Sequence, residues 1–172
     1  MKILNLHGFL GIADNKNYYA LREMVPAENI ISPQMSYKDT SPFEVIQILS
    51  DMVDSDDFIF VGQSLGGLFA DKLSRKYKRP CILTNPCYYP FRLELITSSG
   101  IPQEFVEQYK NIAEYEKNEL ALTMCSDSDT VLPDNYSDCE KLSSEVIRVH
   151  GSHSTIENVG AHFNEIFRKI KI

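Results

Sequence analysis

Residues 60–70 are Phe60-Val61-Gly62-Gln63-Ser64-Leu65-Gly66-Gly67-Leu68-Phe69-Ala70, and this stretch decides the fold. An apolar strand pattern leads into G-x-S-x-G and then into a helix, which is typical of a nucleophile elbow. Gly62 and Gly66 lack the side chains that would collide where strand and helix pass each other on a strained turn. We therefore expect Ser64 to project above a sheet, with the Leu65 amide free to help bind an oxyanion.

Other interpretations of this motif exist. A small-residue turn between strand and helix produces G-x-S-x-G by chance in many α/β proteins, so the motif alone leaves the question open. A dinucleotide-binding loop needs glycine where Ser64 stands, and no G-K-[ST] phosphate loop occurs in the sequence. Both phosphate-binding motifs are thus excluded.

Short apolar runs bounded by turn residues recur along the chain, and most are followed by a stretch with helical signals. This alternation predicts a parallel sheet with helices on both faces. The central runs are almost continuously apolar, as strands covered on both faces are. The predicted strands are Lys2–Leu6, Asn29–Ser32, Phe58–Val61, Cys81–Thr84, Leu120–Cys125 and Val146–Val149.

Three helical segments beyond the elbow are also predicted. Ser41-Pro42-Phe43-Glu44 is typical of a capping box that opens a helix. Apolar residues at three- and four-residue spacing predict a terminal helix from about 155 to 170. Residues 86–118 are rich in tyrosine and contain a helical pattern over 103–116, so we interpret them as a small cap insertion in a single domain of residues 1–172.

Further polar residues follow the other predicted strands. His7-Gly8-Phe9 comes directly after the first strand, where a backbone amide, here that of Phe9, can supply a second oxyanion donor. His7 itself is the weaker candidate for a base, because its place at the strand end suits it to support the loop. Together with the Leu65 amide, this loop predicts an oxyanion hole beside Ser64.

A general base and its acid are expected near the C-terminus. His150 and His153 compete for the role of base, and His153 is favoured because it lies in the loop rather than at the strand end. Asp127 and Asp129 are both chemically suited to orient the imidazole, so the residues alone leave that choice open. A metal site on the two histidines lacks a third His or Cys ligand nearby.

Composition narrows the function further. The 172 residues are 43% hydrophobic and 24% charged, with a formal charge of −7 and no Lys/Arg-rich run, which argues against nucleic acid and anionic membranes as partners. No apolar run is long enough to span a bilayer, the four cysteines lack CxxC spacing, and the first residues do not form a signal peptide. These features predict a cytoplasmic protein with reduced cysteines; its oligomeric state stays open.

The sequence resembles the YqiA-type small esterases of the α/β-hydrolase superfamily over nearly its whole length. The shared segments are Leu6-His7-Gly8-Phe9, Gly62-x-Ser64-Leu65-Gly66-Gly67, Asn85-Pro86 with Pro90-Phe91, Asp129-x-Val131-Leu132, Gly151-x-His153 and Phe163-Asn164. The chain departs from the family pattern at Gln63 and Ser154. The resemblance implies a minimal α/β-hydrolase fold, a three-layer, doubly wound, mostly parallel six-stranded sheet in the order 2-1-3-4-5-6.

The same resemblance selects Asp129 as the acid and implies a Ser64-His153-Asp129 triad that hydrolyses short to medium acyl esters or thioesters without a metal or other cofactor. Tyr88, Tyr89, Phe91 and Phe105 are candidates for the substrate pocket, although aromatic residues in such a segment more often pack against the sheet. Two alternatives remain: a catalytically silent hydrolase fold that binds protein partners, and cleavage of another acyl bond, such as a peptide or lactone, by the same triad.

Overall fold

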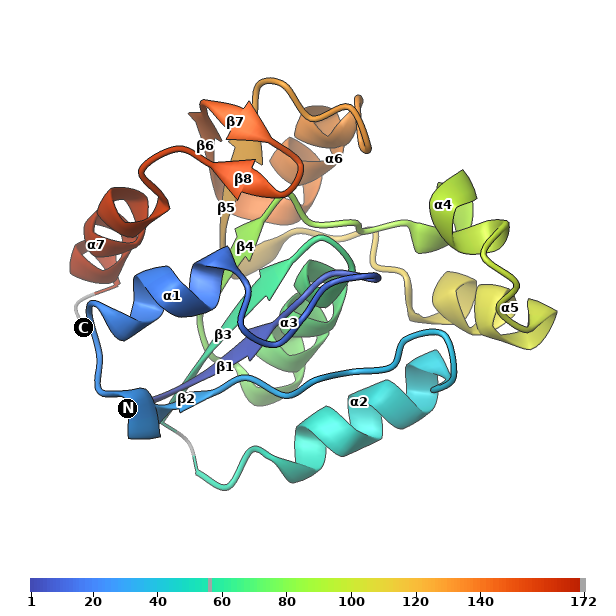
Figure 1. The fold of residues 1–172 in the computed structure, drawn as a ribbon, viewed down its shortest axis with the longest axis horizontal. Coiled ribbons are helices and arrows are strands. Elements are labelled where there is room, and N and C mark those ends of the chain that lie inside the picture. Colours follow the sequence, from blue (N-terminus) through green and yellow to red (C-terminus); the bar gives the residue numbers. More distant parts are fainter. Residues whose placement is uncertain (56, 171–172) are drawn as a thin grey trace.

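A six-stranded parallel sheet forms the centre of the protein in a computed structural model that describes residues 1–55 and 57–170 (Figure 1). Its strand order is β2-β1-β3-β4-β5-β6, and every neighbouring pair is parallel. The predicted fold class and strand order are therefore confirmed. The strands are β1 Lys2–Leu6, β2 Ile30–Ile31, β3 Phe58–Gln63, β4 Cys81–Thr84, β5 Asn118–Ser126 and β6 Ser143–Val149.

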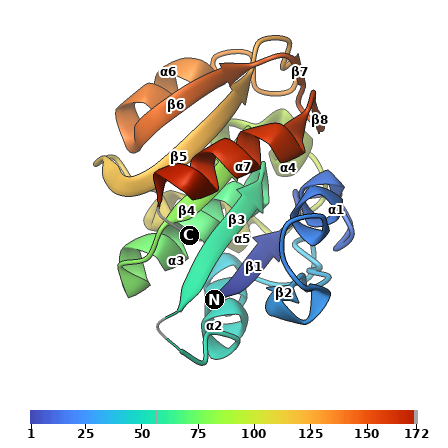
Figure 2. The same cartoon turned by 90° about the vertical axis from the view of Figure 1, so that its left-hand side faces the viewer.

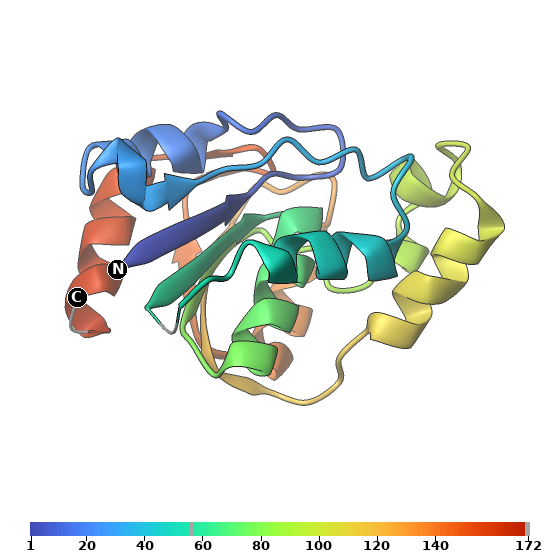
Figure 3. The same ribbon diagram turned by 90° about the horizontal axis from the view of Figure 1, so that it is seen from below.

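Helices cover both faces of the sheet, as near-continuous apolar strands require. In β3, Phe58 and Phe60 face one apolar cluster while Ile59 and Val61 face the other. The first cluster includes α2 (Pro42–Asp51), α3 (Leu65–Tyr77), α5 (Gln103–Ile112) and α6 (Asn135–Leu142). The second contains α1 (Lys16–Arg22) and α7 (Val159–Lys169), which lie together on one side of the sheet in Figures 2 and 3.

Local signals account for where several helices begin and end. The predicted capping box of α2 is present: the Ser41 hydroxyl accepts from the Glu44 amide, and the Glu44 carboxylate accepts from the Ser41 amide. The prediction for α7 was wrong at its start, because Gly151–Ser152 (β7) and Thr155–Ile156 (β8) form a short antiparallel hairpin before the helix. The helix predicted over 103–116 ends at Ile112, where the backbone of Ala113 turns extended.

The segment between β4 and β5 carries a 3-10 turn, η2 (Pro90–Arg92), and the helices α4 (Glu94–Thr97) and α5. Figure 1 shows α4 and α5 side by side at one end of the molecule. Within residues 1–55 and 57–170, no helix combines the length and the apolar composition that a membrane crossing requires. Cys81, Cys87, Cys125 and Cys139 are buried and free.

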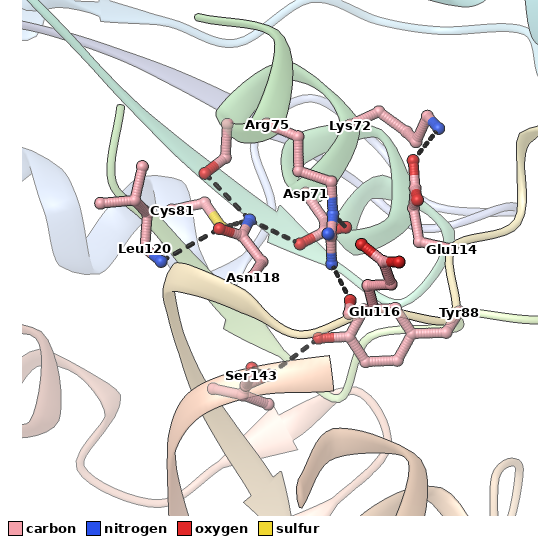
Figure 4. Close-up of polar contacts among 12 residues, drawn as sticks. Asp71, Lys72, Arg75, Cys81, Tyr88, Glu114, Glu116, Asn118, Leu120 and Ser143 are labelled. Atoms are coloured by element: carbon pink, nitrogen blue, oxygen red, sulfur yellow. Dashed lines mark hydrogen bonds and ion pairs between the residues drawn. The ribbon is translucent and has the colours of Figure 1, made fainter. Parts of the chain in front are cut away.

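A buried polar cluster joins α3 to the start of β5 (Figure 4). Asp71 is fully buried, and its carboxylate accepts hydrogen bonds from Arg75 Nε at 2.7 Å and from Asn118 Nδ2 at 2.8 Å. Asn118 Nδ2 also lies 3.1 Å from Ser74 Oγ. Since a buried carboxylate needs partners of this kind, the cluster fixes β5 against the helix that follows the elbow.

Candidate active site

Ser64 lies on a strained turn between β3 and α3, with φ 52° and ψ −121°. A Cβ atom added to Gly62 would lie 2.3 Å from the Gly66 carbonyl oxygen, and one added to Gly66 would lie 2.4 Å from the Leu6 carbonyl oxygen. Only glycine fits at both positions. The Ser64 amide donates to the Thr84 carbonyl at 3.1 Å, which ties the turn to the neighbouring strand β4.

Three side chains from separate loops meet beside this turn. His153 Nε2 lies 2.9 Å from Ser64 Oγ, and His153 Nδ1 lies 2.8 Å from Asp129 Oδ2. The other carboxylate oxygen of Asp129 accepts from the Val131 and Leu132 amides, each at 2.9 Å. The side chains of His153 and Asp129 are only 13% and 3% exposed, so this hydrogen-bonded chain is largely shielded from water.

The environment of Asp129 favours the carboxylate. Burial acts to raise its pKa, but hydrogen bonds from His153 and from the Leu132 and Val131 amides, together with the charge of His153, outweigh burial and lower the pKa. An ionised Asp129 accepts a hydrogen bond from the N–H at His153 Nδ1, so the proton stays on Nδ1 and the Nε2 lone pair faces the Ser64 hydroxyl. The arrangement can therefore accept the serine proton and stabilise the imidazolium that results.

The loop after β1 approaches the serine closely. A Cβ atom added to Gly8 would lie 3.1 Å from Ser64 Cβ. The Gly8 carbonyl lies 2.7 Å from His7 Nδ1 and accepts from the Gly11 amide at 3.0 Å. Because the carbonyl of Gly8 and the N–H of Phe9 belong to one trans peptide, holding this carbonyl directs the Phe9 N–H the opposite way.

The Phe9 and Leu65 amides make no hydrogen bond to another group in the part of the chain that the structure describes. Leu65 is the first residue of α3, where an amide lacks an intrahelical partner. Free amides on the two segments that flank a nucleophile are the donors that an oxyanion needs. Both amides are therefore available as donors, and their role in an oxyanion hole stays a prediction.

His7 is buried and supports the loop that follows β1. Its Nε2 accepts from the Met35 amide at 2.9 Å and lies 3.1 Å from Gln34 Nε2, so its proton resides on Nδ1 and is donated to the Gly8 carbonyl. Burial lowers the His7 pKa, although the bond to Gly8 acts to raise it. A neutral imidazole is what these contacts require.

The competing pair, His150 and Asp127, lies away from this chain of contacts. His150 Nδ1 is 2.5 Å from Asp127 Oδ2, and the His150 side chain is 84% exposed. Asp127 Oδ1 also accepts from the Gly151 amide at 3.3 Å. The structure brings His153 and Asp129 to Ser64, while His150 and Asp127 pair with each other at the surface.

Asn85 is a residue whose importance the sequence analysis missed. Its side chain is fully buried, and Nδ2 lies 2.9 Å from Ser126 Oγ, 3.1 Å from the Ser152 carbonyl and 3.0 Å from the His153 carbonyl. Its Oδ1 accepts from the Ser126 amide at 2.7 Å. The Asn85-Pro86 pair was the only signal in the sequence, and its physical reason is now clear: Asn85 holds the backbone that carries His153.

A groove of about 230 Å³ opens over Ser64 and His153. Its other walls are mainly apolar and come from the loop after β1, from the chain around α4 and from the loop after β5: Phe9, Leu10, Leu93, Leu95 and Val131. None of the four aromatic residues predicted for the pocket lines this groove. Tyr88 and Tyr89 line a neighbouring cavity, and Phe91 and Phe105 pack against the core.

No group of three or more His, Cys, Asp or Glu side chains within residues 1–55 and 57–170 is arranged to hold a metal ion. The pair of histidines considered in the sequence does not form a common site, because His153 faces Ser64 and His150 faces Asp127.

Comparison with solved structures shows the same fold in several proteins. Alpha/beta hydrolase domain-containing protein 10 from mouse superimposes with a TM-score of 0.73 at 13% identity, over 98% of this chain and 90% of that one. The structure reported for LipS and LipT, two metagenome-derived lipolytic enzymes, gives 0.65 at 14%, over 98% and 93%. RedJ, a thioesterase from the prodiginine biosynthetic pathway of Streptomyces coelicolor, gives 0.60 at 11%, over 96% and 89%.

Sequence comparison adds a family. None of the curated proteins matches the chain, but residues 2–168 match the sequence profile of the uncharacterised protein family UPF0227. The match spans every strand of the central sheet and all three side chains that meet at the elbow. The chain belongs to this family, the YqiA type that its sequence resembles, and it has the fold of the α/β hydrolases.

Proposed function

We propose that the protein is a serine hydrolase that cleaves carboxylic esters or thioesters of short to medium acyl chains. The observation that carries this proposal is the continuous hydrogen-bonded chain from Asp129 through His153 to Ser64, on a strained turn beside two free amides. Such a constellation suits acyl transfer, because it activates a hydroxyl and stabilises the oxyanion that forms.

The reaction proceeds in two steps. His153 Nε2 takes the Ser64 proton as Oγ attacks the carbonyl carbon, and the oxyanion accepts hydrogen bonds from the Phe9 and Leu65 amides. The imidazolium, stabilised by Asp129, then gives its proton to the departing alcohol or thiol, which leaves an acyl-serine. A water molecule, deprotonated by His153, attacks the acyl-serine; collapse releases the acid and returns the proton to Ser64.

The groove supports an apolar acyl group of limited size. Its volume of about 230 Å³ is below the range of roughly 300–1,000 Å³ common for drug-sized ligands. Leu10 and Leu95 are exposed at its rim, where an acyl chain covers apolar surface that water otherwise meets. Among the matching structures, LipS and LipT are described as lipolytic enzymes and RedJ as a thioesterase, which is consistent with acyl substrates.

Hydrolysis of p-nitrophenyl esters from acetate to decanoate, alongside matching thioesters, tests the proposal. We expect turnover that is highest for short to medium chains and falls by about 10⁴-fold or more in Ser64→Ala and His153→Ala. Ser137→Ala, a substitution at an exposed serine of α6, is the matched control and retains full activity. Unchanged turnover in folded Ser64→Ala contradicts the proposal.

A further inference from the structure

The catalytic groove has two ends of different chemistry. Leu93 and Leu95, from the chain around α4, line one end, whereas the lining beside Ser64 and His153 includes the polar side chains of their neighbours in sequence, Gln63 and Ser154. Gln63 and Ser154 also line a much smaller space that is bounded by the first residues of α1. Since α1 and α4 lie well apart in Figure 1, an ester bound across Ser64 meets an apolar end and a polar end.

The orientation of the Gln63 side chain is set by Asn15, the N-cap of α1. The Tyr18 amide and Asn5 Nδ2 donate to Asn15 Oδ1, at 2.9 and 3.1 Å. Because a backbone amide can only donate, the position of this oxygen is assigned, and Asn15 Nδ2 donates to Gln63 Oε1 at 3.3 Å. The Gln63 amide therefore turns its Nε2 group away from Asn15.

Gln63 Nε2 is an unpaired donor at the wall of the groove. Gln63 is half-buried, and its Nε2 makes no hydrogen bond within residues 1–55 and 57–170. Unlike the unpaired amide of Asn135, which is cut off from solvent, this group keeps accessible surface. Among the described residues, no Asp or Glu lines the groove or the smaller space. The donor is therefore free to bind an acceptor on a ligand.

The reaction proposed above indicates which half of an ester meets this donor. His153 Nε2 gives its proton to the departing atom, so that atom lies beside His153. Ser154 follows His153 in the chain, and its hydroxyl also makes no hydrogen bond in the part that the structure describes. An apolar acyl chain is favoured at the other end, because covering an unpaired amide with it is costly. The leaving alcohol therefore lies beside Gln63.

We propose that Gln63 selects esters whose leaving alcohol carries an oxygen acceptor close to the scissile bond. Gln63 Nε2 can only donate, so it distinguishes an oxygen from a methylene group at the same place. The acceptor has to be close, because the space beyond Gln63 is about 10 Å³, room for about one water molecule. This inference rests on the proposed esterase function and names the class of leaving group that it prefers.

Two butyrate esters of equal size test the inference. In 2-methoxyethyl butyrate an oxygen replaces one methylene group of the alcohol in butyl butyrate. Asn15→Asp reorients Gln63 from outside the groove: the new carboxylate still accepts from the Tyr18 amide, and its second oxygen accepts from Gln63 Nε2, which turns Gln63 Oε1 toward the groove. We expect the ratio of kcat/KM, methoxyethyl ester over butyl ester, to fall by roughly fivefold or more, since one hydrogen bond is lost.

A second variant and a control complete the test. Gln63→Met removes the donor with little change in size and should lower the same ratio by roughly fivefold. Asn164→Asp adds the same charge as Asn15→Asp at an amide that makes one solvent-exposed hydrogen bond within α7, and it keeps the wild-type ratio. Comparing ratios between variants cancels the intrinsic reactivity of the two leaving groups and any effect common to both esters.

The outcomes separate this inference from the function on which it rests. A ratio in folded Gln63→Met within about twofold of the wild-type ratio overturns the inference while ester hydrolysis stands. Loss of turnover of both esters in that variant, with the fold intact by circular dichroism, also overturns it, since Gln63 would then serve the reaction itself. If Gln63→Met does not fold, Asn15→Asp decides by the same criterion. Absence of any ester turnover in the wild type refutes the esterase function, and the inference with it.

Discussion

Asn85 is predicted to control activity through the position of His153. Asn85→Ala removes four contacts: those of Nδ2 with Ser126 Oγ and the Ser152 and His153 carbonyls, and that of Oδ1 with the Ser126 amide. At about 1 kcal/mol net for each, the free energy of unfolding falls by about 3–4 kcal/mol. The loop that carries the base also loses its tether, and a displacement of about 1 Å in a reacting group lowers the rate by roughly 100-fold.

Two measurements on the same variant separate these effects. Urea denaturation gives the change in unfolding free energy, and initial rates with p-nitrophenyl butyrate, at a temperature where both proteins are folded, give kcat. Asn164→Ala is the matched control, because its amide donates one solvent-exposed hydrogen bond, to the Gly160 carbonyl within α7. The reasoning is refuted if Asn85→Ala retains both the stability and the kcat of the wild type.

The remaining predictions concern the support of the site. Burial depresses the His7 pKa below its ordinary value of 6.5, so the stability that neutral His7 contributes is intact above pH 6.5 and is lost as the pH falls below it. The difference in unfolding free energy between the wild type and His7→Asn should therefore narrow from pH 7 to pH 5. A difference that stays constant over this range contradicts the reasoning. Asp71→Ala removes one buried acceptor from Arg75 and one from Asn118. It should lower the unfolding free energy by roughly 3 kcal/mol while kcat per folded molecule stays unchanged; a selective loss of kcat would mean that this cluster serves the site directly.

Local pattern was sufficient to predict the sheet and the elbow. Successive side chains of a strand point to opposite faces of the sheet, so residues 58–61 contact the two apolar clusters in turn. The close approach of β3 and α3 explains why positions 62 and 66 are glycines. Strand boundaries were less accurate. β5 and β6 start earlier than predicted, because Asn118 and Ser143 are polar residues whose hydrogen bonds to distant groups compensate their burial.

Features that depend on distant contacts could not be predicted. The hairpin of β7 and β8 has two residues per strand, too few to show a period, and Ile156 continues the apolar spacing of α7 by chance. The chemistry of Asp127 and Asp129 left the choice of acid open and the family resemblance selected Asp129; the physical reason lies in the fold, where the Val131 and Leu132 amides orient Asp129 toward His153. Asn85 lies more than 60 residues from the loop that it holds, so no local motif reveals its role.

The central claim is that Ser64 is a nucleophile activated by His153. Intact mass measured after incubation with a fluorophosphonate, followed by peptide mapping, tests it most directly because it requires no knowledge of the substrate. We predict one stoichiometric adduct on Ser64 in the wild type, none in Ser64→Ala, and labelling slowed by at least about 100-fold in His153→Ala. Folded wild-type protein that gains no mass, or gains it at another residue, would contradict the account.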